Sequence, residues 1–197
     1  MLSGRFPNRL STSQPDGANF CSDFLPLNAT LLSEKLAPTY ESYFVGKGHL
    51  GYQTDDHLPV NRGFKSHVGF LGGSEKYHNG GGPADPTSGS HDLWENLDPA
   101  LKLVPNMTYS SNYYTQHAVD LINQQDKNTP FFMYFAIQNV HSPYELPPAW
   151  EERDYPEMWD HTYANMLAVL DGATQNLTDA LHESGRSDPH DTSRISS

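Results

Sequence analysis

The feature that most constrains the fold is a largely apolar run of ten residues, FFMYFAIQNV, at positions 131–140. It follows Thr129 and Pro130, and a proline at that place ends any preceding helix. A continuous apolar run is typical of a strand that is covered on both faces, as in a parallel sheet. We therefore expect a central strand here, within an α/β fold.

Two helical patterns flank this strand. Over residues 111–126, Tyr114, Ala118, Leu121 and Ile122 recur at helical spacing, and Ser110 or Ser111 is available as the N-cap. A second stripe begins near Asp160 and ends before Gly185, which stands where a C-cap glycine belongs. The apolar residues of this second stripe are Tyr163, Met166, Leu167, Leu170, Ala173, Leu177 and Leu181.

Earlier in the chain, residues 30–36 predict a short helix, and ESYFVG at 41–46 predicts a short buried strand. Helices alternating with strands predict an α/β chain with a mostly parallel sheet flanked by helices. Two clear strands are few for such a sheet, so we expect that strands of it are missing. The glycine-rich segment 72–92 predicts a long loop, and we expect the polar tail 186–197 to be disordered.

The charge balance limits the classes of partner. The chain has 24 acidic and 12 basic residues, a net charge of -12, which argues against nucleic acid or an anionic membrane. The single cysteine, Cys21, excludes an internal disulfide framework. No apolar run reaches the roughly 20 residues of a membrane span, and the first residues lack a signal-peptide core. Nothing in the pattern sets an oligomeric state.

Basic side chains follow both predicted strands. Lys47 and His49 come after the first strand, and His141 comes after the second. Ligands of α/β folds gather at the carboxyl ends of the strands, so these three side chains are expected at one rim. An ammonium and two imidazoles there would bind a compact tetrahedral anion, and a histidine could protonate a departing oxygen. Taken singly, each has a plainer interpretation, as a solvated lysine or an incidental histidine.

Several segments, taken in order, resemble the sulfatase family, specifically its arylsulfatase B-like branch within the alkaline-phosphatase superfamily. They are MLSGRFPNR at 1–9, VGKGHLGY at 45–52, LPVNRGFKSHVGFLGG at 58–73, PFFMYFAIQNVHSPYELP at 130–147 and YANMLAVLDGATQNLTDALHESG at 163–185. The resemblance implies a partial alkaline-phosphatase-like sandwich. On this basis residues 1–185 are expected to form part of a sulfatase N-terminal, catalytic domain.

The resemblance also implies roles for three positions. Lys47 would hold the substrate sulfate, His49 would hydrogen-bond the formylglycine hydrate that attacks sulfur, and His141 would contact the sulfate and assist the leaving oxygen. One position departs from the family pattern, because Gly48 stands where the family usually has tryptophan. We expect this change to remove a packing ring and loosen the loop that carries Lys47.

Other parts that the family needs are absent from the chain. Its nucleophile motif would lie just before Met1, and Cys21, followed by SDFLP, does not match that motif. The family's calcium ligands would lie upstream of Met1 and after residue 185. Asp55 and Asp56 are predicted to face solvent, and the tail sequence DPHD at 188–191 is a weak metal motif. Without a nucleophile and a divalent cation, an anion pocket binds its ligand but does not cleave it.

The leading hypothesis is therefore a sulfuric ester hydrolase, acting on aryl sulfates or sulfated sugars with formylglycine and calcium, of which this chain is an incomplete and inactive part. We expect a truncated gene model rather than a true short product. The alternatives are a phosphoesterase of the same superfamily and a secreted, non-catalytic glycoprotein that binds sulfated glycans. Glycosylation sequons at Asn28, Asn106 and Asn176, with the family resemblance, suggest a secretory, lysosomal or extracellular location.

Overall fold

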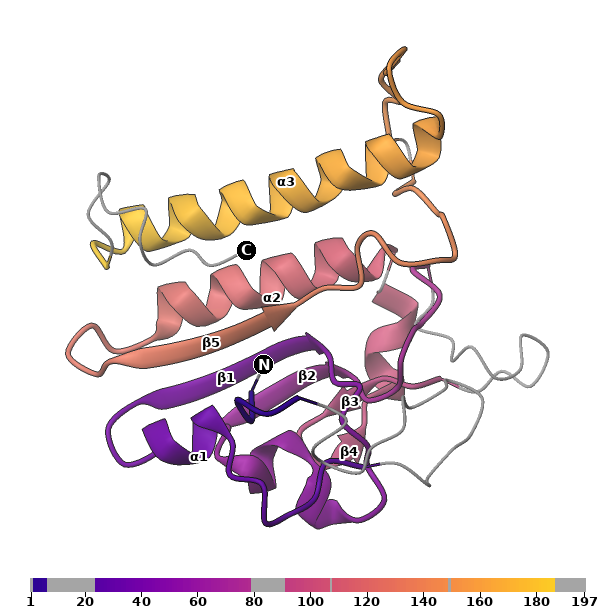
Figure 1. The fold of residues 1–197 in the computed structure, drawn as a ribbon. Helices are drawn as coiled ribbons and strands as arrows, with labels where there is room; N and C mark the ends of the chain where they lie inside the picture. The colour runs from indigo at the N-terminus through magenta and orange to yellow at the C-terminus, as the bar shows by residue number, and fades with distance from the viewer. Residues whose placement is uncertain (1, 7–23, 79–90, 107, 149, 187–197) are drawn as a thin grey trace.

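The computed structural model describes residues 2–6, 24–78, 91–106, 108–148 and 150–186. In chain order the elements are α1 (Leu32–Leu36), β1 (Glu41–Lys47), the 3₁₀ helices η2 (Asp55–His57) and η3 (Pro59–Arg62), β2 (Ser66–Phe70), β3 (Trp94–Glu95), β4 (Asp98–Pro99), the 3₁₀ helix η4 (Leu101–Asn106), α2 (Ser110–Gln124), β5 (Phe131–Ala136) and α3 (His161–Glu183). Figure 1 shows the sheet between α1 on one side and α2 and α3 on the other. This arrangement confirms an α/β fold.

The described strands form one five-stranded sheet in the order β4-β3-β2-β1-β5. β1 lies between β2 and β5 and is parallel to both, while β3 and β4 add a short antiparallel extension. β1 matches the strand predicted at 41–46. The predicted strand at 131–140 is shorter, because the ladder ends at Ala136.

The prediction that the second strand is central was wrong for the described sheet. β5 has one hydrogen-bonded neighbour among the described residues, and each of its six residues is half-buried. A run of apolar residues reports that both faces of a strand are covered, but it says nothing about neighbours in the plane of the sheet. β2, β3 and β4 were not predicted at all.

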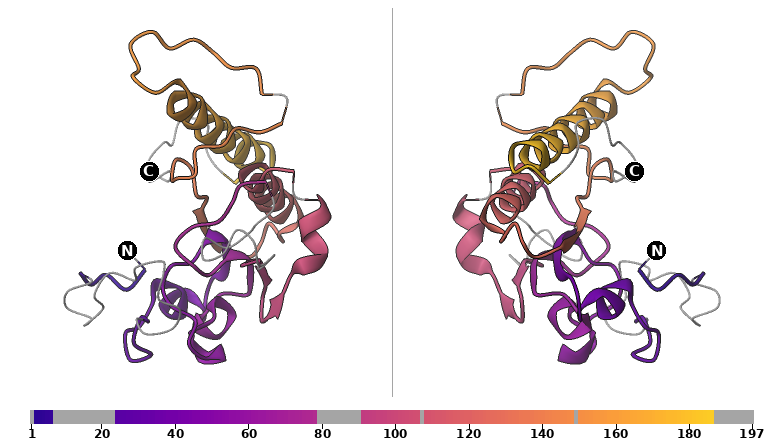
Figure 2. Two further views of the ribbon diagram at one scale, coloured as in Figure 1. Left: turned by 90° about the vertical axis from the view of Figure 1, so that its right-hand side faces the viewer. Right: turned by 90° about the vertical axis from the view of Figure 1, so that its left-hand side faces the viewer.

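Neighbouring side chains of β1 point into different cores. Val45 joins Phe70, Tyr114 and Ala118 under α2, whereas Phe44 joins Leu31 and Phe64 on the α1 face. This alternation follows from the two-residue period of a strand. The sheet is therefore covered on both faces around β1, as the two views in Figure 2 also show.

The helices agree with the predicted ranges, but the predicted N-cap of α2 does not. α3 begins after Asp160, whose carboxylate accepts a hydrogen bond from the Tyr163 N–H at 2.9 Å, and Gly185 has a φ of 70°. The predicted serine cap of α2 was wrong, because Ser110 and Ser111 lie inside the first turn and Tyr109 is the N-cap. Their hydroxyls are buried, and that of Ser111 donates to the Asn139 side chain instead.

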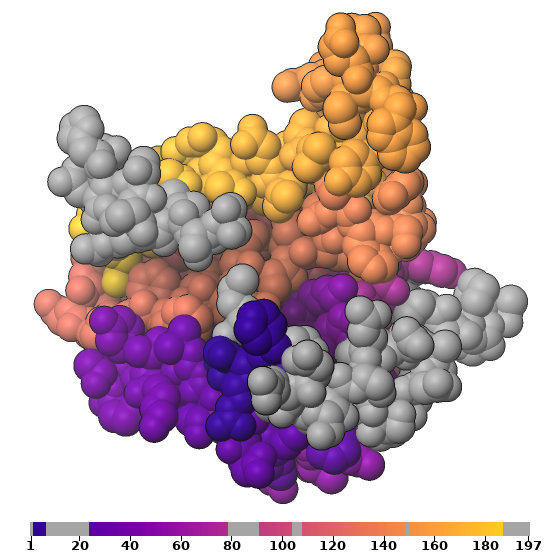
Figure 3. Space-filling view, in the orientation of Figure 1, coloured from indigo at the N-terminus to yellow at the C-terminus, as the bar shows by residue number. Residues whose placement is uncertain are grey.

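A loop before α3 projects beyond the helices, at the upper right of Figure 3. Asn165 of α3, fully buried, closes the base of this loop. Its side chain accepts hydrogen bonds from Trp150 and the Arg153 N–H, and donates to the carbonyls of Arg153 and His161. Trp159, on the projecting part, is 85% exposed. None of the described helices is long and apolar enough to cross a membrane.

A buried histidine makes the stability of this fold depend on pH. His67 of β2 is fully buried, with its ring centroid 4.9 Å from that of Phe44, and burial lowers its pKa to about 4 from 6.5. Because the unfolded chain binds the proton more tightly, stability from neutral His67 is complete above pH 6.5 and is lost as the pH falls towards 4. The loss between pH 7 and pH 5 is about 2 kcal/mol.

Urea unfolding of the wild type and His67→Gln checks this. The difference in free energy of unfolding between the two proteins should shrink by that amount between pH 7 and pH 5. Comparing the two proteins cancels other groups, including Glu75, whose raised pKa acts in the opposite direction. A difference that stays constant across this pH range would contradict the assignment.

Candidate functional site

Two glycines set the spacing of the strands where the candidate site begins. Gly46 of β1 is in register with Gly69 of β2 and Ala136 of β5. A Cβ on Gly69 would lie 2.0 Å from the Gly46 carbonyl oxygen, and a Cβ on Gly46 would lie 2.2 Å from the Ala136 carbonyl oxygen. β1 therefore lies too close to its two neighbours at this level for Gly46 or Gly69 to carry a side chain. Lys47 and the segment after Ala136 leave the sheet together at its carboxyl edge.

Lys47 ends β1 at this edge. Its side chain is half-buried, and burial lowers the pKa of its ammonium. Within the described parts of the chain, no hydrogen bond or ion pair holds that ammonium. A partly buried cation without a carboxylate beside it keeps its full attraction for an incoming anion.

His49 follows in a conformation that few residues adopt. Its φ is 51°, in the left-handed region. Its N–H donates to the Leu71 carbonyl at 3.0 Å, after the Gly48 N–H has donated to the Phe70 carbonyl at 2.8 Å. The imidazole lies against Gly73, where a Cβ would come within 2.9 Å of Nε2. The ring of His49 is thus held against the loop that follows β2.

His141 follows β5 after a short connection and is exposed. Its Nδ1 lies 2.7 Å from the Ser142 carbonyl oxygen, which can only accept, so Nδ1 carries the hydrogen. This leaves Nε2 as the nitrogen that can meet a ligand. The backbone is held separately, because the Tyr77 hydroxyl donates to the His141 carbonyl at 3.0 Å.

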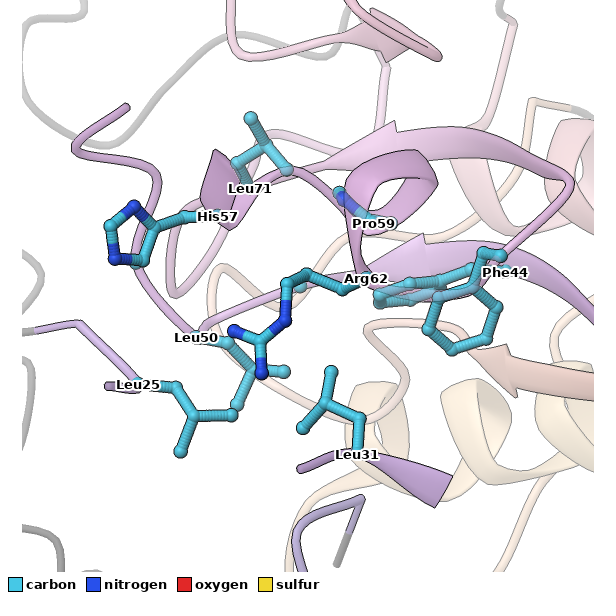
Figure 4. A pocket seen from close by; sticks show the side chains of 11 residues that line it. Leu25, Leu31, Phe44, Leu50, His57, Pro59, Arg62 and Leu71 are labelled. Carbon is cyan, nitrogen blue, oxygen red and sulfur yellow. The ribbon is translucent and has the colours of Figure 1, made fainter. Parts of the chain in front are cut away.

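Gly48 borders a narrow apolar pocket behind the Lys47–His49 turn. Figure 4 shows the Arg62 guanidinium reaching between Leu25, Leu50 and Leu31 in this pocket. The pocket leaves about 20 Å³ for the centre of a water molecule, which is too little for a sulfate. The pocket is therefore not the anion site. The pocket lies beside Gly48, the position where we expected the loss of a packing ring to loosen the loop. The N–H groups of Gly48 and His49 are nevertheless hydrogen-bonded to the carbonyls of Phe70 and Leu71.

Sequence reasoning missed the residues that join the two halves of the site. Gln138, directly after β5, exchanges two hydrogen bonds with the backbone of Glu75, at 2.5 and 2.8 Å. Glu75 is 1% exposed and accepts from the Tyr114 hydroxyl at 3.0 Å. Burial, with the charge of Asp92 adding to it, raises the pKa of Glu75 to about 8. The only sequence signal was a glycine-rich stretch, which marks a loop but not its partners.

Asp92 organises the start of the same loop. Its carboxylate accepts from the N–H groups of Leu71 and Gly72 at 3.2 and 2.6 Å, and from the indole of Trp94 at 2.9 Å. Burial nevertheless raises its pKa above the ordinary value. The loop backbone is thus fixed at both ends, by Asp92 and by Gln138.

The remaining candidates do not form a metal site. Asp55 and Asp56 are exposed in η2, as predicted. In the described ranges, no group of three His, Cys, Asp or Glu side chains is placed to hold a metal ion. Cys21 and the tail motif at 188–191 lie outside the described residues. The described residues therefore do not fit a calcium site, and we derive no step through that ion.

At the carboxyl edge of the sheet, β1 ends at the partly buried Lys47, His49 follows two residues later, and His141 follows the end of β5 by five residues. Such groups suit a tetrahedral oxyanion, because fixed donors stabilise negative charge without reorganising.

Known proteins of one kind match this chain. It is 37% identical over 164 residues to arylsulfatase J of Mus musculus, covering 82% of this chain and 27% of that protein. It is 28% identical over 158 residues to the N-acetylgalactosamine-6-sulfatase of Homo sapiens, covering 73% of this chain and 29% of that protein. The chain therefore spans less than a third of the length of these curated relatives.

Solved structures agree on the fold. The crystal structure of Ps i-CgsB in complex with k-i-k-neocarrahexaose superposes with a TM-score of 0.74 at 23% identity. The match covers 95% of this chain and 44% of that one. At this identity the likeness shows the fold alone. The family model for sulfatases, however, matches residues 1–190. The chain belongs to the sulfatase family.

Proposed function

We propose that this chain forms part of a sulfuric ester hydrolase and supplies the side of its site that grips the sulfate. Lys47 holds the sulfate by charge, His49 orients the attacking group, and His141 contacts the sulfate and assists the leaving oxygen. The observation that carries the proposal is the half-buried Lys47 ammonium, without a counter-ion among the described residues, at the sheet edge where His49 and His141 emerge.

Formylglycine and calcium belong to the family's chemistry. The described residues include neither the motif whose residue becomes formylglycine nor a group of calcium ligands. We propose that the complete reaction needs both and that residues 1–197 alone bind sulfate without hydrolysing its esters. A phosphoesterase of the same superfamily is the second candidate, and a non-catalytic glycan-binding glycoprotein is the third. Preference for inorganic phosphate over sulfate would favour the phosphoesterase.

Exposed aromatic rings favour a sulfated sugar over a small aryl sulfate. Tyr144, three residues after His141, is 46% exposed and contacts Tyr163 edge to face at 5.8 Å. Trp159, four residues before Tyr163, is the most exposed large apolar residue of the described chain. Exposed aromatic surface is characteristic of binding sites, and flat rings suit the apolar faces of sugars.

We also propose passage through the secretory pathway, with glycosylation at Asn28, Asn106 and Asn176. Asn28 lies exposed in a turn after Leu25, and Asn176 lies exposed on α3. Asn106 ends η4, and its side chain lies outside the described part. A glycan needs solvent, and the positions of Asn28 and Asn176 meet that condition.

Sulfate titration tests the role of Lys47. Inorganic sulfate should bind the wild type, and Lys47→Ala should weaken its binding at least about tenfold, because a charge-assisted contact is lost. Lys127→Ala is the matched control, since it removes the same charge from an exposed position after α2. Calorimetry measures both dissociation constants at one ionic strength. Equal weakening in the two variants would mean that only net charge matters and would sink the proposal.

A further inference from the structure

The loop after β2, residues 71–77, lies between the two halves of the proposed site; we call it the bridging loop. On one side it holds the Lys47–His49 turn. The Leu71 carbonyl accepts from the His49 N–H, and Gly73 lies against the His49 imidazole. The turn that carries His49 therefore moves with the bridging loop.

On its other side the bridging loop holds the segment that carries His141. Gln138 acts as a clamp, since its amide accepts from the Glu75 N–H and donates to the Glu75 carbonyl. The side chain of Gln138 is 3% exposed, so water does not compete with these two bonds. The His141 N–H in turn donates to the Gln138 carbonyl at 2.8 Å.

Tyr77 adds a second tie at the end of the same loop. It is fully buried, its hydroxyl donates to the His141 carbonyl, and its N–H donates to the Glu145 carboxylate at 3.0 Å. Its ring stacks on Tyr109 at 5.0 Å. Both hydrogen bonds are partly buried, and the buried, stacked ring fixes the position of the hydroxyl that makes one of them.

The bridging loop is also anchored to α2. The Tyr114 hydroxyl of α2 donates to the Glu75 carboxyl, which is buried away from the ligand edge. Burial favours the neutral acid there, so the anchor adds little negative charge beneath an anion site. A chain of hydrogen bonds through the buried residues Glu75, Tyr77 and Gln138 thus connects the turn of His49 with the segment of His141.

We propose that Gln138 and Tyr77 are positioning residues that set the separation of His49 and His141 and thereby the fit for a sulfate group. The proposal rests on the sulfate site proposed above. Neither side chain touches the anion. Each acts through the backbone of the segment that carries His141.

Gln138→Leu removes both clamp bonds at similar volume and should weaken inorganic sulfate binding by about tenfold, since two buried hydrogen bonds no longer hold the site. Tyr77→Phe removes only the hydroxyl bond and should weaken it about threefold. If Gln138→Leu does not fold, Tyr77→Phe still tests the proposal. Amide hydrogen exchange at His141, measured on the full chain without sulfate, should accelerate in both variants.

Tyr109→Phe is the matched control. Its hydroxyl donates to the Glu145 carbonyl at 2.9 Å and also interacts with the Asn139 side chain, so it makes bonds of the same kind from the same stacked pair but none to His141 itself. It should lower the stability about as much as Tyr77→Phe while leaving the sulfate dissociation constant unchanged. A purely structural role of Tyr77 would make the two variants alike in sulfate binding and would overturn the proposal.

The outcomes separate this inference from the proposed function. If the wild type binds no sulfate at millimolar concentration, the proposed function fails. The positioning role then depends on exchange at His141: acceleration by Gln138→Leu and Tyr77→Phe, but not by Tyr109→Phe, supports it, and equal exchange in all three overturns it. If the wild type binds sulfate and both variants bind equally well, only the positioning role fails.

Discussion

Replacing Gly46 with alanine should cost about 3–5 kcal/mol of the free energy of unfolding. The added Cβ would lie 2.2 Å from the Ala136 carbonyl oxygen and 2.7 Å from its carbon, and both atoms belong to backbone that cannot turn away. The φ of 102° at Gly46 adds strain for any other residue. β1 and β5 would have to separate, and with them Lys47 and the segment that carries His141.

Urea unfolding measures this cost, and Gly172→Ala is the matched control. Gly172 lies in α3, and nothing stands within 4 Å of a Cβ added there. Alanine at this helical position should stabilise the chain by up to about 1 kcal/mol. Opposite shifts from the same chemical change would isolate the close strand approach. Equal urea midpoints for the two variants would contradict the strand spacing described here.

Replacing Arg62 with methionine should cost about 2–3 kcal/mol, because it breaks a partly buried ion pair and leaves the Glu34 carboxylate without its cation. Arg62 is 4% exposed, and its Nε lies 2.7 Å from the Glu34 carboxylate. Its guanidinium also donates to the Ala29 carbonyl at 2.7 Å, and the Ser33 hydroxyl donates to the Arg62 carbonyl at 2.6 Å. The pair thus ties α1 to η3 over the α1 face of the sheet.

The effect on Glu34 gives a second readout. Burial alone would raise its pKa, but the hydrogen bonds from Arg62 and from the Leu31 N–H hold that pKa below 4.5. Stability from this pair is therefore complete above pH 4.5 and is lost on further acidification. In Arg62→Met, only burial and the Leu31 bond remain, so the pKa of Glu34 should rise. Carboxyl NMR titration follows it directly.

The exposed pair between Lys102 and Glu95 is the control for this variant. Its atoms lie 2.6 Å apart, yet the lysine side chain is 72% exposed. Lys102→Ala should change the free energy of unfolding far less than Arg62→Met does, because water screens exposed pairs. A similar cost for both variants would mean that burial does not strengthen the Arg62 pair.

Part of the fold was predictable because its elements carry local patterns. β1, α2 and α3 were found near their true bounds from runs and stripes of apolar residues. β2 was missed, because its sequence SHVGF mixes a histidine and a glycine into five residues. Its status as a strand comes from pairing with β1 and β3, which no local pattern reports. The same holds for β3 and β4, each two residues long.

The candidate site likewise has a part that sequence patterns pointed to and a part that they missed. Lys47, His49 and His141 were proposed because residues that follow parallel strands emerge at one edge of the sheet. Gln138, Glu75 and Tyr77 were not found, because their hydrogen bonds join positions more than sixty residues apart. An amide or a carboxyl in a loop gives no sign of burial until its partner is known.

By itself, the sequence determined the α/β class and the sulfatase lineage, and it singled out the three side chains proposed for the site. These depend on the order of residues along short segments, and short segments keep their periodicity and motifs whatever surrounds them. Only the tertiary structure decided the close approach at Gly46, the burial that raises the pKa of Glu75 and the loop that joins His49 to His141. Those depend on distances between remote parts of the chain, and burial changes the energy of a charge or a hydrogen bond only after these parts have packed.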